Sequence, residues 1–423
     1  ASREYADLVQ SQIVHDIRML HNPGWTRREL WDRGYRESRT PSSPSMLLEL
    51  LSHQNFEDMK YGLDPAFRFT VCRAVYKGML KYLSNRYGCR YQVQPLPVHS
   101  MAISPADEGK AIVSWEDTAD PAEPTARAKG HILYTRIDDG AFDSGKVLRE
   151  THKTDGRNWA EVSIEPGHIY SFRIAAYNDG GISFPSETLC IGIPSGNADG
   201  RAVLVVNNFS RVSGPAFFDT PSYGGFTHET DRGVPYISDI SYIGDMYEMR
   251  RGAQWISNDN PGFGASWSSY AGKKLAGNTF DYPYIHGKAI MKAGHPFFSC
   301  SSEAFCTEAS LTEKAWSMDL ICGKQVTVPS AADSAAFAVF PQELQQAIRS
   351  FTSKGGNVLV SGAHIGTDIW DSVYPAVKDS RQTESAKAFA QGVLGFKWVR
   401  NNASRTGEVA FERNCTTVTD SLR

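Results

Sequence analysis

The sequence predicts a multidomain protein in which an all-β sandwich lies between two α/β units. Apolar residues recur at helical spacing in residues 1–91, whereas in residues 92–196 they alternate with polar residues in short runs between turns. From residue 197 onward, apolar strand-like runs alternate with helical patterns, which is typical of a three-layer α/β domain. We therefore expect domain boundaries at 1–91, 92–196 and 197–423.

Residues 1–91 are predicted to form a helix, a strand and a second helix. Ser2 is a suitable helix N-cap, the apolar residues of 5–20 share one helical face, and Asn22-Pro23-Gly24 stops that helix. Residues 67–83 carry an i, i+4 apolar stripe that predicts the second helix. Between them, the short apolar run 46–48 suits a buried strand.

Glu49 follows that run directly. A carboxylate at the end of a buried strand lies where α/β folds place their sites, and burial raises the pKa of such a group toward the range useful for proton transfer. The alternative is an ordinary solvated glutamate at a strand end. The pattern of residues leaves both interpretations open.

A longer motif surrounds Glu49. Its residues, in chain order, are Arg36, Pro44, Leu47, Leu48, Glu49, Asn55, Glu57, Asp64, Pro65, Phe67, Ala74, Val75, Gly78 and Tyr82. They resemble the C-terminal third of the zinc-dependent N-acetylmuramoyl-L-alanine amidases that cut peptidoglycan. Leu51-Ser52 and Gln54 depart from the Gly-Phe and Ser of that family. The resemblance implies a partial amidase α/β domain in which Glu49 is the catalytic carboxylate beside zinc.

The resemblance also implies that the zinc ligands lie before Ala1. His15, His21 and His53 are the local alternatives, but six residues separate the first two, so they point to different faces of the predicted helix. The sequence therefore predicts no metal ligand within the chain. Arg36 belongs to an arginine-rich segment that suits an anionic wall polymer or, equally, a solvated surface.

Residues 92–196 predict a sandwich of short strands. Trp115 and Tyr134 are expected in its core, and Tyr170 suits a tyrosine corner. The run Tyr170 to Asn178, followed by Gly181-Ile-Ser-Phe-Pro-Ser-Glu, resembles a fibronectin type III domain, which implies a spacer or binding module. The expected strands are 98–103, 111–116, 131–137, 159–164, 169–177 and 188–193.

Residues 197–423 predict strands at 201–207, 297–301, 318–322, 337–340 and 357–361, with a helix at 341–352. The order resembles flavodoxin-like or class I glutamine-amidotransferase-like folds. Those amidotransferases carry a cysteine on a strand-to-helix elbow, and the elbow here reads Ser361-Gly-Ala-His-Ile-Gly366. Cysteine nucleophile chemistry is therefore not expected. A disulfide among Cys300, Cys306 and Cys322 stays open.

Several polar and aromatic residues of this last unit are candidates for ligand binding. Trp267 and Tyr282 could hold a sugar ring, with His286 nearby, or they could fill a core beneath long loops. His364 and Asp368 are four residues apart, so on a helix they could orient a ligand or cap that helix.

The chain has 423 residues, a net charge of -3 and no apolar run long enough to span a bilayer. The near-neutral balance argues against nucleic acid as the main partner, and no signal peptide is visible. The resemblance implies a periplasmic or cell-surface zinc hydrolase that cleaves the amide between N-acetylmuramic acid and L-alanine. The alternatives are a lyase-like polysaccharide-processing protein and a non-catalytic glycan-binding protein.

Overall fold

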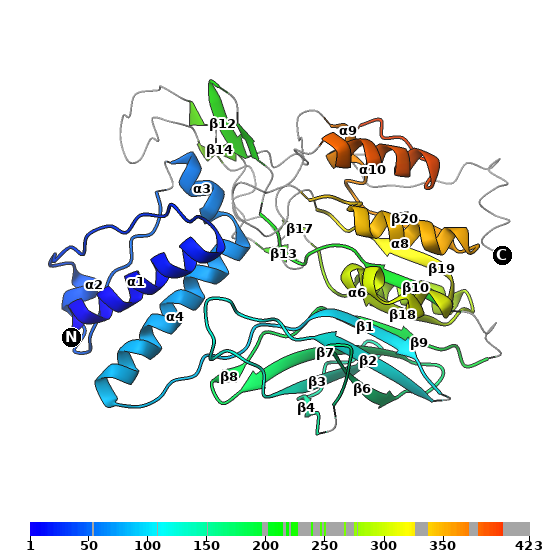
Figure 1. Cartoon of the computed structure of the whole chain (residues 1–423), viewed down its shortest axis with the longest axis horizontal. Helices are drawn as coiled ribbons and strands as arrows, with labels where there is room; N and C mark the ends of the chain where they lie inside the picture. Colours follow the sequence, from blue (N-terminus) through cyan, green and yellow to red (C-terminus); the bar gives the residue numbers. More distant parts are fainter. Residues whose placement is uncertain are drawn as a thin grey trace.

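In the computed structural model, the described residues include ten helices and twenty strands, α1–α10 and β1–β20, many of which are labelled in Figure 1. The described residues are 1–52, 55–107, 109–149, 151–196, 202–214, 217–219, 221–226, 238–239, 246–247, 249–250, 266–267, 275–276, 278–325, 337–371 and 380–400.

Two long helices, α1 (Ser2–Leu20) and α4 (Pro65–Tyr87), lie side by side in the front unit (Figure 1). Both were predicted. Asp64 caps α4 by accepting a hydrogen bond from Ala66 N at 2.8 Å, and Gly88 ends it with a φ of +64°. Gly78 lets the helices approach closely, because a Cβ there would lie 2.7 Å from Val9 Cα. The core between them contains Tyr5, Val9, Ile13, Ile17, Phe67, Val71, Ala74 and Tyr82.

The strand predicted at 46–48 is absent, and that prediction was wrong. Leu47 and Leu48 are 46% and 40% exposed, and the segment carries no regular structure. A strand needs a neighbour to pair its backbone groups, and no described strand pairs with this segment. Two short helices flank it instead, α2 (Arg36–Arg39) and α3 (Phe56–Gly62).

The middle unit is a two-sheet sandwich. One sheet has the strand order β4-β3-β7-β9 and the other β1-β2-β6-β5, with β8 beside β7. All six predicted strands are present within a few residues. The bounds are β1 (His99–Pro105), β2 (Lys110–Glu116), β3 (Gly130–Ile137), β4 (Lys146–Val147), β5 (His152–Thr154), β6 (Arg157–Ser163), β7 (Ile169–Asn178), β8 (Gly181–Ile182) and β9 (Leu189–Gly192).

The aromatic predictions for the sandwich had different outcomes. Trp115 is fully buried in the core, as expected. Tyr170 accepts a hydrogen bond from Glu165 N through its hydroxyl at 3.3 Å, the upstream backbone contact of a tyrosine corner. Tyr134 is only half-buried, and Leu133 faces the core instead, because neighbouring residues of a strand point to opposite sides.

The last unit contains a parallel sheet with the strand order β18-β10-β19-β20. Helix α5 (Tyr282–Lys292) packs on one face, and α6 (Ser302–Thr307), α7 (Ala309–Glu313), α8 (Gln342–Ser353) and α10 (Ser380–Gly392) pack on the other. The strands are β10 (Ala202–Asn207), β18 (Phe297–Ser301), β19 (Ala315–Ile321) and β20 (Asn357–Ser361).

Four of the five predicted strands and the predicted helix at 341–352 are confirmed in this unit. Residues 337–340 form no strand, so that prediction was wrong. Val339 and Phe340 are buried, but Val339 N donates to the Asp368 carboxylate rather than to a neighbouring strand. Residues 337–340 are therefore apolar because they are buried in a loop before α8, and not because they form a strand.

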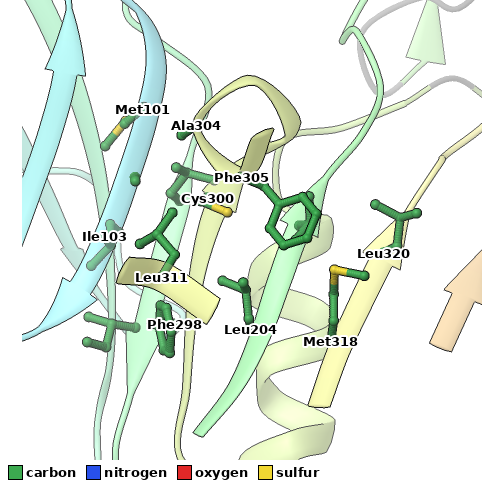
Figure 2. Packing of buried hydrophobic residues seen from close by; sticks show 14 of the residues in the cluster. Met101, Ile103, Leu204, Phe298, Cys300, Ala304, Phe305, Leu311, Met318 and Leu320 are labelled. Atoms are coloured by element: carbon green, nitrogen blue, oxygen red, sulfur yellow. The ribbon is translucent and has the colours of Figure 1, made fainter. Parts of the chain in front are cut away.

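The sandwich and the parallel sheet are joined through β18. Its free edge pairs antiparallel with both β9 and β1, so one continuous 13-stranded sheet runs through the two units. Figure 2 shows Met101 and Ile103 of β1 in the same core as Leu204 and Phe298 of the parallel strands. We call this junction the seam. Among the described residues, three ion pairs join the two units there: Arg157–Glu308 at 2.6 Å, Arg136–Asp281 at 2.9 Å and Lys288–Asp139 at 3.1 Å.

All six cysteines in the described part of the chain are free, so a bridge among Cys300, Cys306 and Cys322 is absent. Within the same residues, no helix is both long and apolar enough to cross a membrane.

Candidate functional site

The strand order of the parallel sheet fixes where a ligand can approach. Across the sheet, the strands that come second, first, third and fourth in the sequence lie side by side. The connection that leaves β10 therefore crosses one face of the sheet, and the connection that leaves β19 crosses the other. In open α/β sheets, ligands bind outside the carboxyl ends of the strands at such a switch point. We call this end of the sheet the carboxyl edge. Its polar residues are Asn207, Asn208, Ser301, Lys324, Ser361 and His364.

Between β10 and β19, the chain's own amides occupy the carboxyl edge. Asn278 is fully buried, accepts a hydrogen bond from Lys324 N at 2.8 Å and donates to Ser210 O at 3.2 Å. Gln325 accepts from Ser210 N at 2.7 Å. The two loops are thus tied together at the switch point, and a ligand must bind to either side of them.

On the β20 side, His364 and Asp368 are both 8% exposed. Asp368 accepts from Val339 N at 2.9 Å through one oxygen, whereas its other oxygen and His364 Nδ1 have no hydrogen-bond partner. Buried polar atoms without partners are rare and call for an explanation such as a ligand or ordered water. The two residues do not share a helix, because α9 (Thr367–Trp370) starts after His364.

The pKa values of this pair are set mainly by burial. Burial, with a smaller contribution from the nearby Lys324 charge, lowers the pKa of His364 to about 4. Burial raises the pKa of Asp368 to about 6. At neutral pH the imidazole is therefore uncharged, with one nitrogen that can donate and one that can accept.

Cys322 lies next to this pair, directly after β19. Burial raises the pKa of its thiol to about 12, and Asn208 Nδ2 lies 3.7 Å from its sulfur. The thiolate is the nucleophilic form of cysteine. Cys322 is therefore protonated at neutral pH and is a poor nucleophile.

On the β18 side, a second polar group lies against the sandwich. Asn207 Nδ2 donates to Glu187 Oε2 at 2.5 Å, and Glu303 Oε2 accepts from Ser100 N at 3.1 Å. Burial raises the pKa of Glu187 to about 8, although Asn207 lowers it, and the nearby Glu303 charge raises it further. Glu187, Asn207 and Glu303 were all missed by the sequence analysis.

Two of the candidate ligand residues lie one turn apart on α5. His286 Nδ1 is 2.7 Å from Asp319 Oδ2, and Asp319 is buried in β19. Tyr282 packs edge-on against Phe209 with ring centroids 5.4 Å apart, and burial raises its pKa. Tyr282 is half-buried and packs against the core beside α5.

The other predicted site residues lie apart from these. His364 is on the carboxyl edge after β20, and Arg36 is exposed on α2 in the front unit. Trp267 belongs to β16 (Ser266–Trp267), which pairs with β14 (Met246–Tyr247). Its side chain is outside the described part of the structure.

Glu49 is exposed to solvent, on the segment that was expected to be a strand. His53 lies outside the described residues. Among the described residues, no group of three or more His, Cys, Asp or Glu could hold a metal ion. The predicted position of Glu49 at the end of a buried strand was therefore wrong.

The missed residues carry a weak sequence signal. Asn207-Asn208 directly follows the apolar run Val-Leu-Val-Val, and Asp319 interrupts the apolar strand 315–321. Polar residues at the end of a buried parallel strand mark the edge where ligands bind. Glu187 and Glu303 have no such signal, because they meet only through the pairing of β18 with the sandwich.

No family model matches the sequence, and no curated protein is significantly similar to it. Solved structures match over about a quarter of the chain. The twitchin kinase region from C. elegans has 23% identity and a TM-score of 0.20, covering 25% of this chain and 18% of its own. The third fibronectin III domain of human KIAA0343 has 15% identity and a TM-score of 0.20, covering 26% of this chain and 93% of its own.

Chicken CNTN1 FN1–FN3 matches with 13% identity and a TM-score of 0.19, covering 24% of this chain and 33% of its own. The middle unit is fibronectin type III-like. Its two sheets, its buried Trp115 and its tyrosine corner carry that description independently of these similarities.

Proposed function

We propose that this chain binds a cell-surface glycan through the carboxyl edge of its parallel sheet. The observation that carries the proposal is the pair His364 and Asp368, each nine-tenths buried with one polar atom that has no partner. The strand order supports a flavodoxin-like arrangement, in which this edge is the expected place for a ligand.

The chemistry of the pair favours hydroxyl groups over an anion. His364 is neutral at neutral pH and offers Nδ1, and Asp368 offers one acceptor oxygen. A sugar hydroxyl both donates and accepts, so it can satisfy both atoms. The buried Cys322 thiol and the half-buried Tyr282 do not supply catalysis or a stacking platform in this proposal.

The test is a calorimetric titration of the full chain with N-acetylglucosamine oligomers and with soluble muropeptides. His364→Ala is expected to weaken binding by about 3–10-fold, which corresponds to the loss of one hydrogen bond. His168→Ala, which removes an exposed histidine of the sandwich, is the matched control and should bind like the wild type. No binding, or equal binding by His364→Ala, contradicts the proposal.

Peptidoglycan hydrolysis is the second proposal and rests on the amidase-like motif around Glu49. The exposed position of Glu49 supports it only in that the carboxylate is accessible. In such a reaction Glu49 would transfer the proton, and a bound zinc ion would supply polarisation of the carbonyl and of a water molecule. The zinc ligands are expected outside the residues that the structure describes.

Purified sacculi separate the two proposals. Release of stem peptides that is lost on chelation and in Glu49→Gln supports amide hydrolysis. Intact sacculi in the presence of added zinc contradict it for this chain and leave the binding proposal unaffected.

A further inference from the structure

Two carboxylates and one amide meet where the parallel sheet joins the sandwich. Glu187 lies two residues before β9, Asn207 ends β10, and Glu303 lies in the first turn of α6 after β18. Strand pairing sets Asn207 beside Ser301, so that Glu303 follows two residues beyond that contact. Three separate segments therefore bring oxygen atoms to one place.

Asn207 lies between the other two segments of this group in the sequence, at the end of β10. Its side chain is buried, with the residue only 4% exposed, and Nδ2 donates to Glu187 Oε2 at 2.5 Å. Its Oδ1 has no hydrogen-bond partner. Because Oδ1 and Nδ2 share one carbon atom, this unsatisfied oxygen lies close to the Glu187 carboxylate.

The two carboxylates have no cationic partner among the described ion pairs. Glu303 uses Oε2 to accept from Ser100 N and Oγ, at 3.1 Å and 3.4 Å, which leaves Oε1 for another contact. Burial is the main cause that raises the pKa of Glu187, and the nearby Glu303 charge raises it as well. Like charges brought together in this way are relieved by a proton or by a cation.

We propose that Glu187, Glu303 and the Asn207 Oδ1 atom form a binding site for a divalent hard cation, for which Ca²⁺ is the best fit. Carboxylate and amide oxygens are the ligands that Ca²⁺ takes, with water completing the coordination. Zinc sites instead rely largely on nitrogen and sulfur donors. The thiol of Cys300 on β18 belongs to the hydrophobic core, and burial raises its pKa well above the ordinary value.

A cation in this position links the two units. Glu187 belongs to the sandwich, whereas Asn207 and Glu303 belong to the parallel sheet. Binding to the folded chain alone stabilises it in proportion to ligand concentration. Ca²⁺ would therefore hold the seam closed in addition to the strand pairing of β18 with β9 and β1.

The experiment is a calorimetric titration of the full chain with CaCl₂ at neutral pH, together with thermal unfolding in CaCl₂ and in EDTA. With three protein ligands we expect a Kd of about 10⁻⁴–10⁻³ M, as in extracellular modules, and a higher Tm in CaCl₂. Glu303→Gln should weaken binding at least tenfold. Glu303 is exposed, so this variant is expected to fold, which near-UV circular dichroism checks.

Glu161→Gln is the matched control, because Glu161 is an exposed glutamate on β6 paired with Lys110. It should bind Ca²⁺ like the wild type. Asn207→Ala provides a second variant and should also weaken binding. The proposal is overturned if wild-type protein shows neither binding heat nor a Tm shift at millimolar Ca²⁺, or if Glu303→Gln and Asn207→Ala bind as tightly as the wild type.

Discussion

The front helical unit and the seam each contain an acidic side chain that is shielded from water, but the groups that surround the two carboxylates differ in charge. In the front unit, Asp16 is 1% exposed and lies 2.6 Å from Lys77 Nζ, with Gln12 donating to its other oxygen at 2.8 Å. At the seam, Glu187 faces an amide and a second carboxylate. Lys77 neutralises the first acid, whereas the second has no cationic partner among the ion pairs of the described residues.

This difference separates a stabilising contact from a candidate binding site. A buried ion pair with satisfied hydrogen bonds is complete without any further molecule. Two neighbouring carboxylates repel each other, and an amide oxygen without a hydrogen bond lacks a partner. A bound proton or cation relieves the repulsion, and a cation can also bind the oxygen. We therefore expect substitutions in the two regions to differ in size and in their response to pH and Ca²⁺.

Lys77→Met should have the largest effect. It leaves Asp16 buried without a counter-charge, and breaking a buried pair in this way costs about 3–5 kcal/mol of unfolding free energy. Urea unfolding measures the loss. Lys110→Met, which removes the exposed partner of Glu161, is the control and should change stability little. Equal, small losses in both variants would contradict the assignment of a stabilising buried pair.

Gly78→Ala tests the packing of the same unit. The added methyl group meets the Val9 backbone, which cannot move without shifting α1, so we expect a loss of about 1–3 kcal/mol. Gly392→Ala lies at the end of α10 with no atom within 4 Å of the new methyl group and serves as the control. Thermal unfolding of both variants gives the comparison. A Gly78→Ala protein as stable as the control would show that α1 and α4 do not approach this closely.

Glu187→Gln tests the pH response of the seam. The pKa of Glu187 is about 8 in the folded chain against 4.5 as its ordinary value. Between these values the folded state binds more protons, so this group stabilises the fold fully below about pH 4.5, and that contribution is lost as pH rises through 8. In EDTA, we expect wild-type Tm to fall over this range relative to the variant.

Parallel Tm curves for wild type and Glu187→Gln would show that this carboxyl group titrates normally. Other acids with raised pKa values, such as Asp64 and Asp368, are present in both proteins and cancel in the comparison.

Glu49→Gln should have the smallest effect. The side chain is exposed and lies on a segment without regular structure, so we expect unchanged stability and unchanged Ca²⁺ binding. Chemical denaturation and the CaCl₂ titration measure both. A clear loss of stability would mean that Glu49 makes a contact that the structure does not contain.

Local patterns predicted most elements of this fold. The six sandwich strands and helices α1, α4 and α8 follow from spacing, caps and turn residues that act within a few positions. Residues 46–48 and 337–340 were predicted as strands because their composition is apolar, yet a strand also requires a neighbour for its backbone. Burial alone explains Val339 and Phe340.

The candidate sites were only partly predictable. His364 was identified because it lies four residues before Asp368 where a helix was expected to start, although α9 begins only after His364. The seam cluster depends on β18 pairing with strands of another unit, about 200 residues apart for Ser100 and Glu303. No periodicity or motif in the sequence predicts that these residues lie close together, because their proximity depends on how the two sheets pair with each other.

The most direct test of the seam site is an anomalous diffraction measurement on crystals of the full chain grown with Tb³⁺ in place of Ca²⁺. The account predicts an anomalous peak within about 2.3–2.6 Å of oxygens of Glu187, Asn207 and Glu303. Occupied lanthanide sites elsewhere on the surface, with no peak between these three side chains, would contradict it.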